Sequence, residues 1–122
     1  MRVVIVEDDA LLREGLSLLL AGEGFTVAAA VGDAEAFLAA VEAERPDLAV
    51  VDVRLPPGFR ADGIKAALAA RRLRPGLPVL LATGYAAEIR PGAEPLVRLD
   101  KPFTQEALAD AINDCLARAA AI

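Results

Sequence analysis

Five side chains capable of chemistry lie at or just beyond the ends of short apolar segments. They are the acids Glu7, Asp8 and Asp52, the hydroxyl of Thr83 and the ammonium of Lys101. Three carboxylates brought together repel one another and lose hydration, so such a cluster normally holds a hard divalent cation, for which Mg²⁺ is the natural choice. A lysine and a hydroxyl beside that ion would complete a phosphoryl site, because two cations would neutralise the transferring group and a donor would bind one of its oxygens.

These residues need elements that bring them to one place. Short apolar runs at 3–6, 48–52, 77–82 and 96–99, with a weaker alanine-rich run at 25–31, predict the strands of a parallel sheet. Helical patterns alternate with them at 10–21, 34–44, 64–72 and 104–119, and residues 86–90 allow at most a turn or two of helix. Five strands joined by right-handed crossovers predict an α/β, doubly wound, three-layer domain. In such sheets the ligand crevice lies at the carboxyl ends of the strands.

Capping signals and apolar spacing define the helices. Asp9 is expected to cap the first helix, Gly32-Asp33 opens the second, and Thr104 caps the last. The first helix places its core face on leucines at helical spacing, namely Leu12, Leu16, Leu19 and Leu20.

Length, charge and cysteine content exclude several classes of function. The 122 residues fit one domain over 1–122, and a net charge of -5 without a basic stripe disfavours nucleic-acid binding. Cys115 is expected to be a buried filler and not a nucleophile, and Arg71, Arg72 and Arg74 a solvated cluster at a helix end. The first apolar run is followed at once by acidic residues, so it is too short for the apolar region of a signal peptide. No segment could span a bilayer, and we therefore expect a cytoplasmic protein without membrane contact.

Four motifs, in order, resemble those of two-component response-regulator receiver domains, and the resemblance covers the whole chain. It implies a flavodoxin-like fold with sheet order 2-1-3-4-5, in which a histidine kinase or histidine phosphotransfer protein passes a phosphoryl group to the acceptor aspartate. The motifs match the family's acidic pair, acceptor aspartate, switch threonine and lysine-proline pair, and they are Val6-Glu7-Asp8, Val51-Asp52 with Leu55-Pro56, Ala82-Thr83-Gly84 and Lys101-Pro102-Phe103.

The resemblance also implies roles for the acidic residues. Asp52 would be the phosphoacceptor, and Asp8 and Asp52 would bind Mg²⁺ directly, together with the backbone carbonyl of Arg54. Glu7 would act mostly through water.

Further roles and departures surround the phosphoryl group. By the same resemblance, Thr83 would hydrogen-bond that group, Lys101 would pair with it, and Gly84 matches the small residue that gives the phosphate access. The family's aromatic switch position is Arg98 here. Tyr85 is therefore a candidate gate, with a merely packed tyrosine as the alternative. The segment between Thr83 and Lys101 is about one helical turn short for the family, which predicts a stunted or mobile helix there.

We therefore expect a stand-alone receiver with no effector domain after Ile122, whose output is contact with a downstream protein. Its only activities would be its own phosphorylation and dephosphorylation, so it is not expected to be an enzyme. One alternative is a pseudo-receiver that binds partners without phosphorylation, although no acidic, acceptor or lysine position is lost. Another is a small Mg²⁺-dependent phosphatase, although Arg54 replaces the second aspartate such enzymes need. A receiver excised from a longer kinase or regulator is a third possibility.

Overall fold

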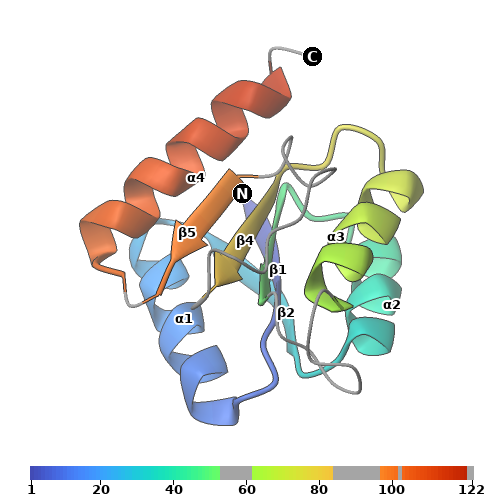
Figure 1. Ribbon diagram of the computed structural model, residues 1–122, viewed down its shortest axis with the longest axis horizontal. Helices are drawn as coiled ribbons and strands as arrows, with labels where there is room; N and C mark the ends of the chain where they lie inside the picture. Colours follow the sequence, from blue (N-terminus) through green and yellow to red (C-terminus); the bar gives the residue numbers. More distant parts are fainter. Residues whose placement is uncertain (53–61, 84–96, 102, 121–122) are drawn as a thin grey trace.

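The structure is a computed structural model that describes residues 1–52, 62–83, 97–101 and 103–120. Strands and helices alternate along the first four strands of the chain (Figure 1). The elements are β1 (Arg2–Val6), α1 (Ala10–Gly22), β2 (Thr26–Val31), α2 (Ala34–Glu44), β3 (Leu48–Asp52), α3 (Asp62–Leu73), β4 (Val79–Thr83), β5 (Val97–Asp100) and α4 (Gln105–Ala120).

The five strands form one parallel sheet in the order β2-β1-β3-β4-β5. This confirms the predicted flavodoxin-like, doubly wound α/β fold. The chain leaves β1 for β2 on one side and returns to β3 on the other, so β1 and β3 flank the point where the winding reverses. Ligand crevices of doubly wound sheets lie at that point, beyond the carboxyl ends of the strands.

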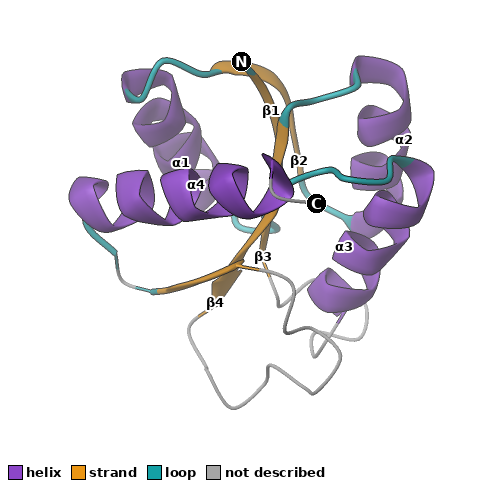
Figure 2. Ribbon diagram, turned by 90° about the horizontal axis from the view of Figure 1, so that it is seen from above, coloured by secondary structure: helices purple, strands orange, loops and turns teal. Residues whose placement is uncertain are grey.

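Helices cover both faces of the sheet, α1 and α4 on one side and α2 and α3 on the other (Figure 2). Alternate residues of each central strand enter the two resulting cores. Val3 and Ile5 pack with α1 and α4, whereas Val4 and Val6 pack with α2 and α3. Every residue of β3 is buried, as its continuous apolar run predicts for a strand covered on both faces.

The predicted capping residues begin their helices. The side chain of Asp9 accepts hydrogen bonds from the amides of Leu11 and Leu12, and Asp33 accepts one from Ala36. Thr104 Oγ1 accepts one from the Ala107 amide at 3.0 Å. Each bond satisfies an amide that has no partner within its own helix.

Two expectations for these elements were wrong in detail. Leu12 is not in the core but 53% exposed, because it lies in the first turn of α1 and lines an open groove there. β4 begins at Val79, two residues later than predicted, since Pro78 has no N–H and the Leu77 amide bonds back to the Arg74 carbonyl. The predicted short helix at 86–90 lies outside the described residues.

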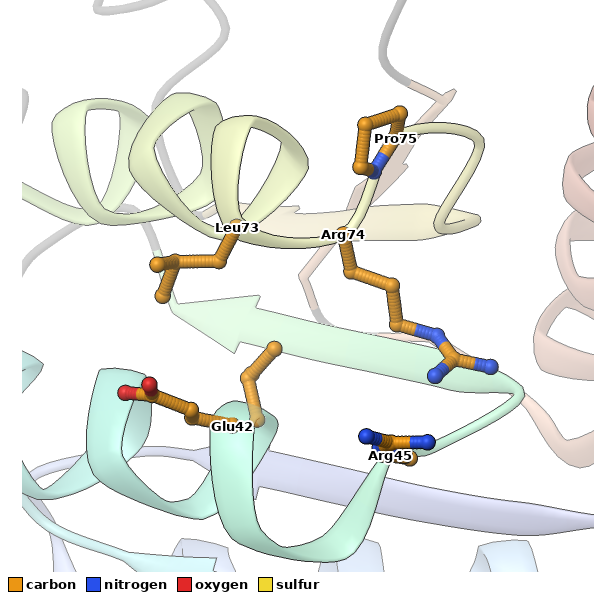
Figure 3. A pocket seen from close by; sticks show the side chains of 6 residues that line it. Glu42, Arg45, Leu73, Arg74 and Pro75 are labelled. Atoms are coloured by element: carbon orange, nitrogen blue, oxygen red, sulfur yellow. The ribbon is translucent and has the colours of Figure 1, made fainter.

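A hollow of about 280 Å³ lies between the ends of α2 and α3 (Figure 3). In this view the side chain of Arg74 reaches toward Arg45, and Glu42 points away from both. These helix ends precede β3 and β4, so the hollow is at the opposite end of the strands from Asp52. The arginines at this end are therefore separate from the acidic cluster, and their expected role as a solvated cluster stays a prediction.

Within the described ranges, no helix combines the length and the apolar character that crossing a membrane requires.

Candidate metal centre

The sheet brings three acids together at its carboxyl edge. Glu7 and Asp8 directly follow β1, and Asp52 is the last residue of β3. The two strands are neighbours with Val6 paired to Val51, so Glu7 and Asp52 are the next residues along adjacent strands. This position places both carboxylates at the winding-reversal point of the sheet.

The three carboxylates are close enough to act on one ligand. One oxygen from each of Glu7, Asp8 and Asp52 lies within 4.8 Å of the other two. Glu7 is only 3% exposed and Asp52 only 7% exposed, whereas Asp8 lies at the surface. Two buried acids side by side are costly unless they are paired or bind a cation, so this geometry requires positive charge beside the cluster.

Lys101 supplies a positive charge to the same cluster. Its Nζ lies 3.0 Å from Oε1 of Glu7 and 3.5 Å from Oδ1 of Asp52. The lysine follows β5, at the same end of the sheet. The predicted juxtaposition of a lysine with the acids is therefore present, with Glu7 as its nearer partner.

The protonation of the cluster reflects burial and mutual repulsion. Burial raises the pKa of Glu7, and the nearby Asp52 carboxyl raises it further, although the hydrogen bond from Lys101 opposes this. The pKa of Asp8 is raised by partial desolvation and by Glu7. Burial alone would lower the pKa of Lys101, but its hydrogen bond to Glu7 and the charge of Asp52 outweigh that effect and raise it. Lys101 is thus held in its charged form at neutral pH.

A divalent cation fits this donor set. Three ionised carboxylates and one ammonium leave two negative charges in excess, which one divalent ion would balance. In octahedral Mg²⁺ sites the metal–oxygen distance is about 2.1 Å, so opposite ligands are roughly 4.2 Å apart. One oxygen from each of the three carboxylates lies within 4.8 Å of the other two, so the three are grouped on the scale of such a site. Glu7, Asp8 and Asp52 would hold the ion.

The other predicted site residues are placed only in part. Thr83 ends β4 and pairs with Asp100 of β5, which puts its backbone at the same edge of the sheet; its side chain lies outside the described part. Arg98 is on β5, where its exposed side chain forms an ion pair with Asp100 at 3.3 Å. The predicted roles of Arg54, Gly84 and Tyr85 fall on positions outside the described residues.

One residue beside the site was not anticipated from the sequence. Arg13 of α1 donates from Nη1 to the backbone carbonyl of Glu7 at 2.8 Å. The only signal in the sequence is a basic residue early in the first helix, which is common on solvated helix faces and does not indicate a partner.

An apolar groove of about 760 Å³ adjoins the cluster. Glu7 and Lys101 are among the residues that line it, so the groove and the acidic site are continuous. Its walls carry leucines with large exposed side chains, Leu12 among them and Leu18 at 68% exposure. The remaining lining residues come from α1, β4 and the segment before α4, and they are Leu11, Gly15, Leu16, Leu19, Ala82 and Phe103.

Comparison with known protein families gives one match over most of the chain. Residues 3–113 match the response regulator receiver domain model. The chain is 33% identical over 123 residues to the transcriptional regulatory protein PdtaR of Mycobacterium tuberculosis, an alignment covering 96% of this chain and 57% of PdtaR. It is 39% identical over 85 residues to the probable transcriptional regulatory protein TcrX of the same species, covering 70% of this chain and 35% of TcrX. The chain thus spans little more than half the length of PdtaR and about a third of TcrX.

Solved structures of the same shape include a CheY-like response regulator receiver domain protein from Methanospirillum hungatei. It superposes with a TM-score of 0.80 at 27% identity, covering 98% of this chain and 95% of that one. NtrX from Brucella abortus, in complex with ADP, superposes with a TM-score of 0.83 at 26% identity, over 98% of this chain and 27% of NtrX.

Proposed function

The chain belongs to the receiver-domain family of two-component response regulators, and from this premise we propose that it is a phosphorylation switch whose acceptor is Asp52. The donor would be the phosphohistidine of a histidine kinase or a histidine phosphotransfer protein, and the cofactor would be Mg²⁺. The observation that carries the proposal is the convergence of the carboxylates of Glu7, Asp8 and Asp52, within 4.8 Å, beside the ammonium of Lys101.

In the proposed reaction an oxygen of the Asp52 carboxylate attacks phosphorus. An O–P bond forms, the N–P bond of the phosphohistidine breaks, and the leaving imidazole nitrogen takes up a proton from solvent. A bound Mg²⁺ would act as a Lewis acid that neutralises charge on the transferring phosphoryl oxygens. The raised pKa of Lys101 keeps a second positive charge at the same place, and electrostatic stabilisation of this kind dominates phosphoryl transfer.

Phosphorylation would then change the balance of charge at the cluster. The new group brings additional negative charge, and Lys101 would shift from Glu7 toward a phosphoryl oxygen, which is the better acceptor for a single ammonium. Thr83 would donate its hydroxyl to the same group. Because β4 and β5 are paired at Thr83 and Asp100, these movements would alter the end of both strands, and a downstream protein would read that face.

The phosphodonor would dock on the apolar groove. A protein that delivers a phosphohistidine to Asp52 must cover the surface next to the cluster, and the groove continues directly from Glu7 and Lys101. Its exposed leucines supply the apolar anchors that a protein interface needs. The docking partner is thus a helical or looped segment of the donor protein that presents apolar side chains beside its histidine.

The acidic pair, the acceptor Asp52 and Lys101 lie together in this chain. A pseudo-receiver would lack one of these groups, so their presence supports a phosphorylated receiver. Arg54 in place of a second aspartate argues against a phosphatase acting on other substrates, so the proposed activity is limited to the receiver's own phosphorylation and dephosphorylation. A cytoplasmic location and a single domain over residues 1–122 stay predictions.

The test is Mg²⁺-dependent labelling with acetyl phosphate, together with beryllofluoride binding, in wild type and Asp52→Asn. Wild type should form an acyl phosphate only with Mg²⁺, and Asp52→Asn should form none. Asp110→Asn is the matched control, since Asp110 is an exposed acid on α4 and should label like wild type. Undiminished labelling of Asp52→Asn would refute the proposal.

A further inference from the structure

Arg13 crosses from α1 to the loop that carries the acidic pair. Its guanidinium is partly buried, and Nη1 donates to the Glu7 carbonyl at 2.8 Å. That carbonyl belongs to the peptide unit joining Glu7 to Asp8. The hydrogen bond therefore acts on the one backbone group whose orientation sets how the two acids point relative to each other.

Gly32 provides the space for this crossing. A Cβ built on Gly32 would lie 3.1 Å from Nη1 of Arg13 and 3.9 Å from the Glu7 carbonyl oxygen. The first distance is shorter than ordinary van der Waals contact, so a Cβ at position 32 would require the guanidinium to shift by a few tenths of an ångström. Gly32 directly follows β2, and Arg13 thus runs between α1 and the β2–α2 connection.

The backbone of Glu7 is held on both sides. Its amide donates to the Val31 carbonyl at the end of β2, at 3.0 Å, and its carbonyl accepts from Arg13. Asp9, two residues later, is fixed as the cap of α1. The Glu7-Asp8 peptide is therefore constrained from β2, from α1 and from the helix cap, and among the described residues Arg13 supplies the hydrogen bond to its carbonyl.

We propose that Arg13 is a positioning residue for the metal centre, which sets the orientation of the Glu7-Asp8 peptide so that both carboxylates converge with Asp52 on one cation. The inference rests on the proposed function, since it assigns Arg13 a role in Mg²⁺ binding. Groups that orient metal ligands from outside the ligand set typically contribute 10- to 100-fold in metal affinity. Arg13 would act at the lower end of that range because it holds the backbone and not a carboxylate.

The experiment compares Mg²⁺ titrations of wild type, Arg13→Met, Arg13→Lys and Gly32→Ala, followed by NMR amide shifts. Arg13→Met should weaken Mg²⁺ binding about tenfold, and Gly32→Ala several-fold, because its Cβ displaces the guanidinium. Arg13→Lys should fall between wild type and Arg13→Met, since it keeps a donor on a shorter reach. Controls are Arg72→Met, an exposed arginine on α3, and Gly22→Ala at the end of α1, whose Cβ would meet nothing within 4 Å; both should bind like wild type.

Two further readouts separate positioning from general stability. The carbonyl ¹³C shift of Glu7 in the metal-free protein should move in Arg13→Met, which removes the donor, and less in Gly32→Ala, which shifts the donor, but not in the controls. Urea midpoints measured alongside should not rank the variants in the order of their Mg²⁺ affinities. Arg13→Met binding Mg²⁺ within twofold of wild type would overturn the inference alone. A wild type without any response to Mg²⁺ would overturn the proposed function and the inference with it.

Discussion

The ammonium of Lys101 lies 3.0 Å from Oε1 of Glu7, across 94 positions of the chain. The contact joins the segment after β5 to the end of β1, although β3 and β4 separate these strands in the sheet. Glu7 is buried and Lys101 is partly buried, so solvent screens the pair less than a surface ion pair. In the metal-free state this contact compensates the most buried charge of the cluster.

Replacing Lys101 by alanine should therefore destabilise the metal-free protein. A buried hydrogen-bonding group left without its partner costs about 1–3 kcal/mol, and a charged group more, so we expect a loss of at least about 1 kcal/mol in urea unfolding with EDTA present. Glu7→Gln in the Lys101→Ala background should recover much of it, because the uncompensated charge is removed. If the effects of the two substitutions on the free energy of unfolding simply added, the two side chains would not be coupled.

Asp8→Asn should have opposite effects on stability and on metal binding. Asp8 is exposed and lies beside two other acids, so neutralising it should stabilise the metal-free protein by about 0.5–1 kcal/mol, in the range of surface charge interactions. The same substitution should remove most of the stabilisation that Mg²⁺ gives wild type. Thermal unfolding with EDTA and with excess Mg²⁺ measures both effects. A variant that Mg²⁺ stabilises as much as wild type would argue against Asp8 as a ligand.

Leu18→Gln should slow phosphorylation by a protein donor and leave phosphorylation by acetyl phosphate unchanged. Leu18 is 68% exposed in the groove, and losing its burial in a complex should cost about 1 kcal/mol, or roughly fivefold in the transfer rate constant. The control is Leu73→Gln, which alters a leucine that is 50% exposed at the end of α3 and outside the groove. Transfer from a phosphorylated histidine phosphotransfer protein is the measurement. Equal slowing by both variants would place the docking surface elsewhere.

Cys115 should be inert in the folded protein and should make stability fall at high pH. Burial raises the pKa of its thiol to about 11, so the folded state favours the protonated form. The stabilisation that this pKa difference gives the folded state is fully present below the ordinary thiol pKa near 9, and it is lost as the pH rises toward 11. Between pH 8.5 and 10.5, wild type should lose about 1–2 kcal/mol more than Cys115→Ala. Urea unfolding at both pH values tests this, and rapid alkylation of the native protein at pH 8 would contradict it.

Most of the fold could be predicted from the sequence because its signals are local. Apolar runs, capping side chains such as Asp9, and chain breaks at proline act over a few residues, so they indicate the elements without knowledge of long-range contacts. Local signals do not predict the order of the strands in the sheet. The prediction of that order rests on the four motifs that resemble those of receiver domains. The apolar side chain of Leu77 predicts an earlier start for β4, whereas the Leu77 amide donates to the Arg74 carbonyl in a turn.

By itself, the sequence determined which groups could do chemistry. Acids and a lysine at strand ends predicted a shared edge, because parallel strands must present their carboxyl ends together. Only the tertiary structure decided the partners within that edge: that Lys101 lies nearer to Glu7 than to Asp52, that Leu12 lines a groove, and that Arg13 reaches the Glu7 carbonyl past Gly32. Local patterns fix the element on which a residue lies. Differences of an ångström between side chains far apart in the chain depend instead on strand register and helix packing, which no local pattern encodes.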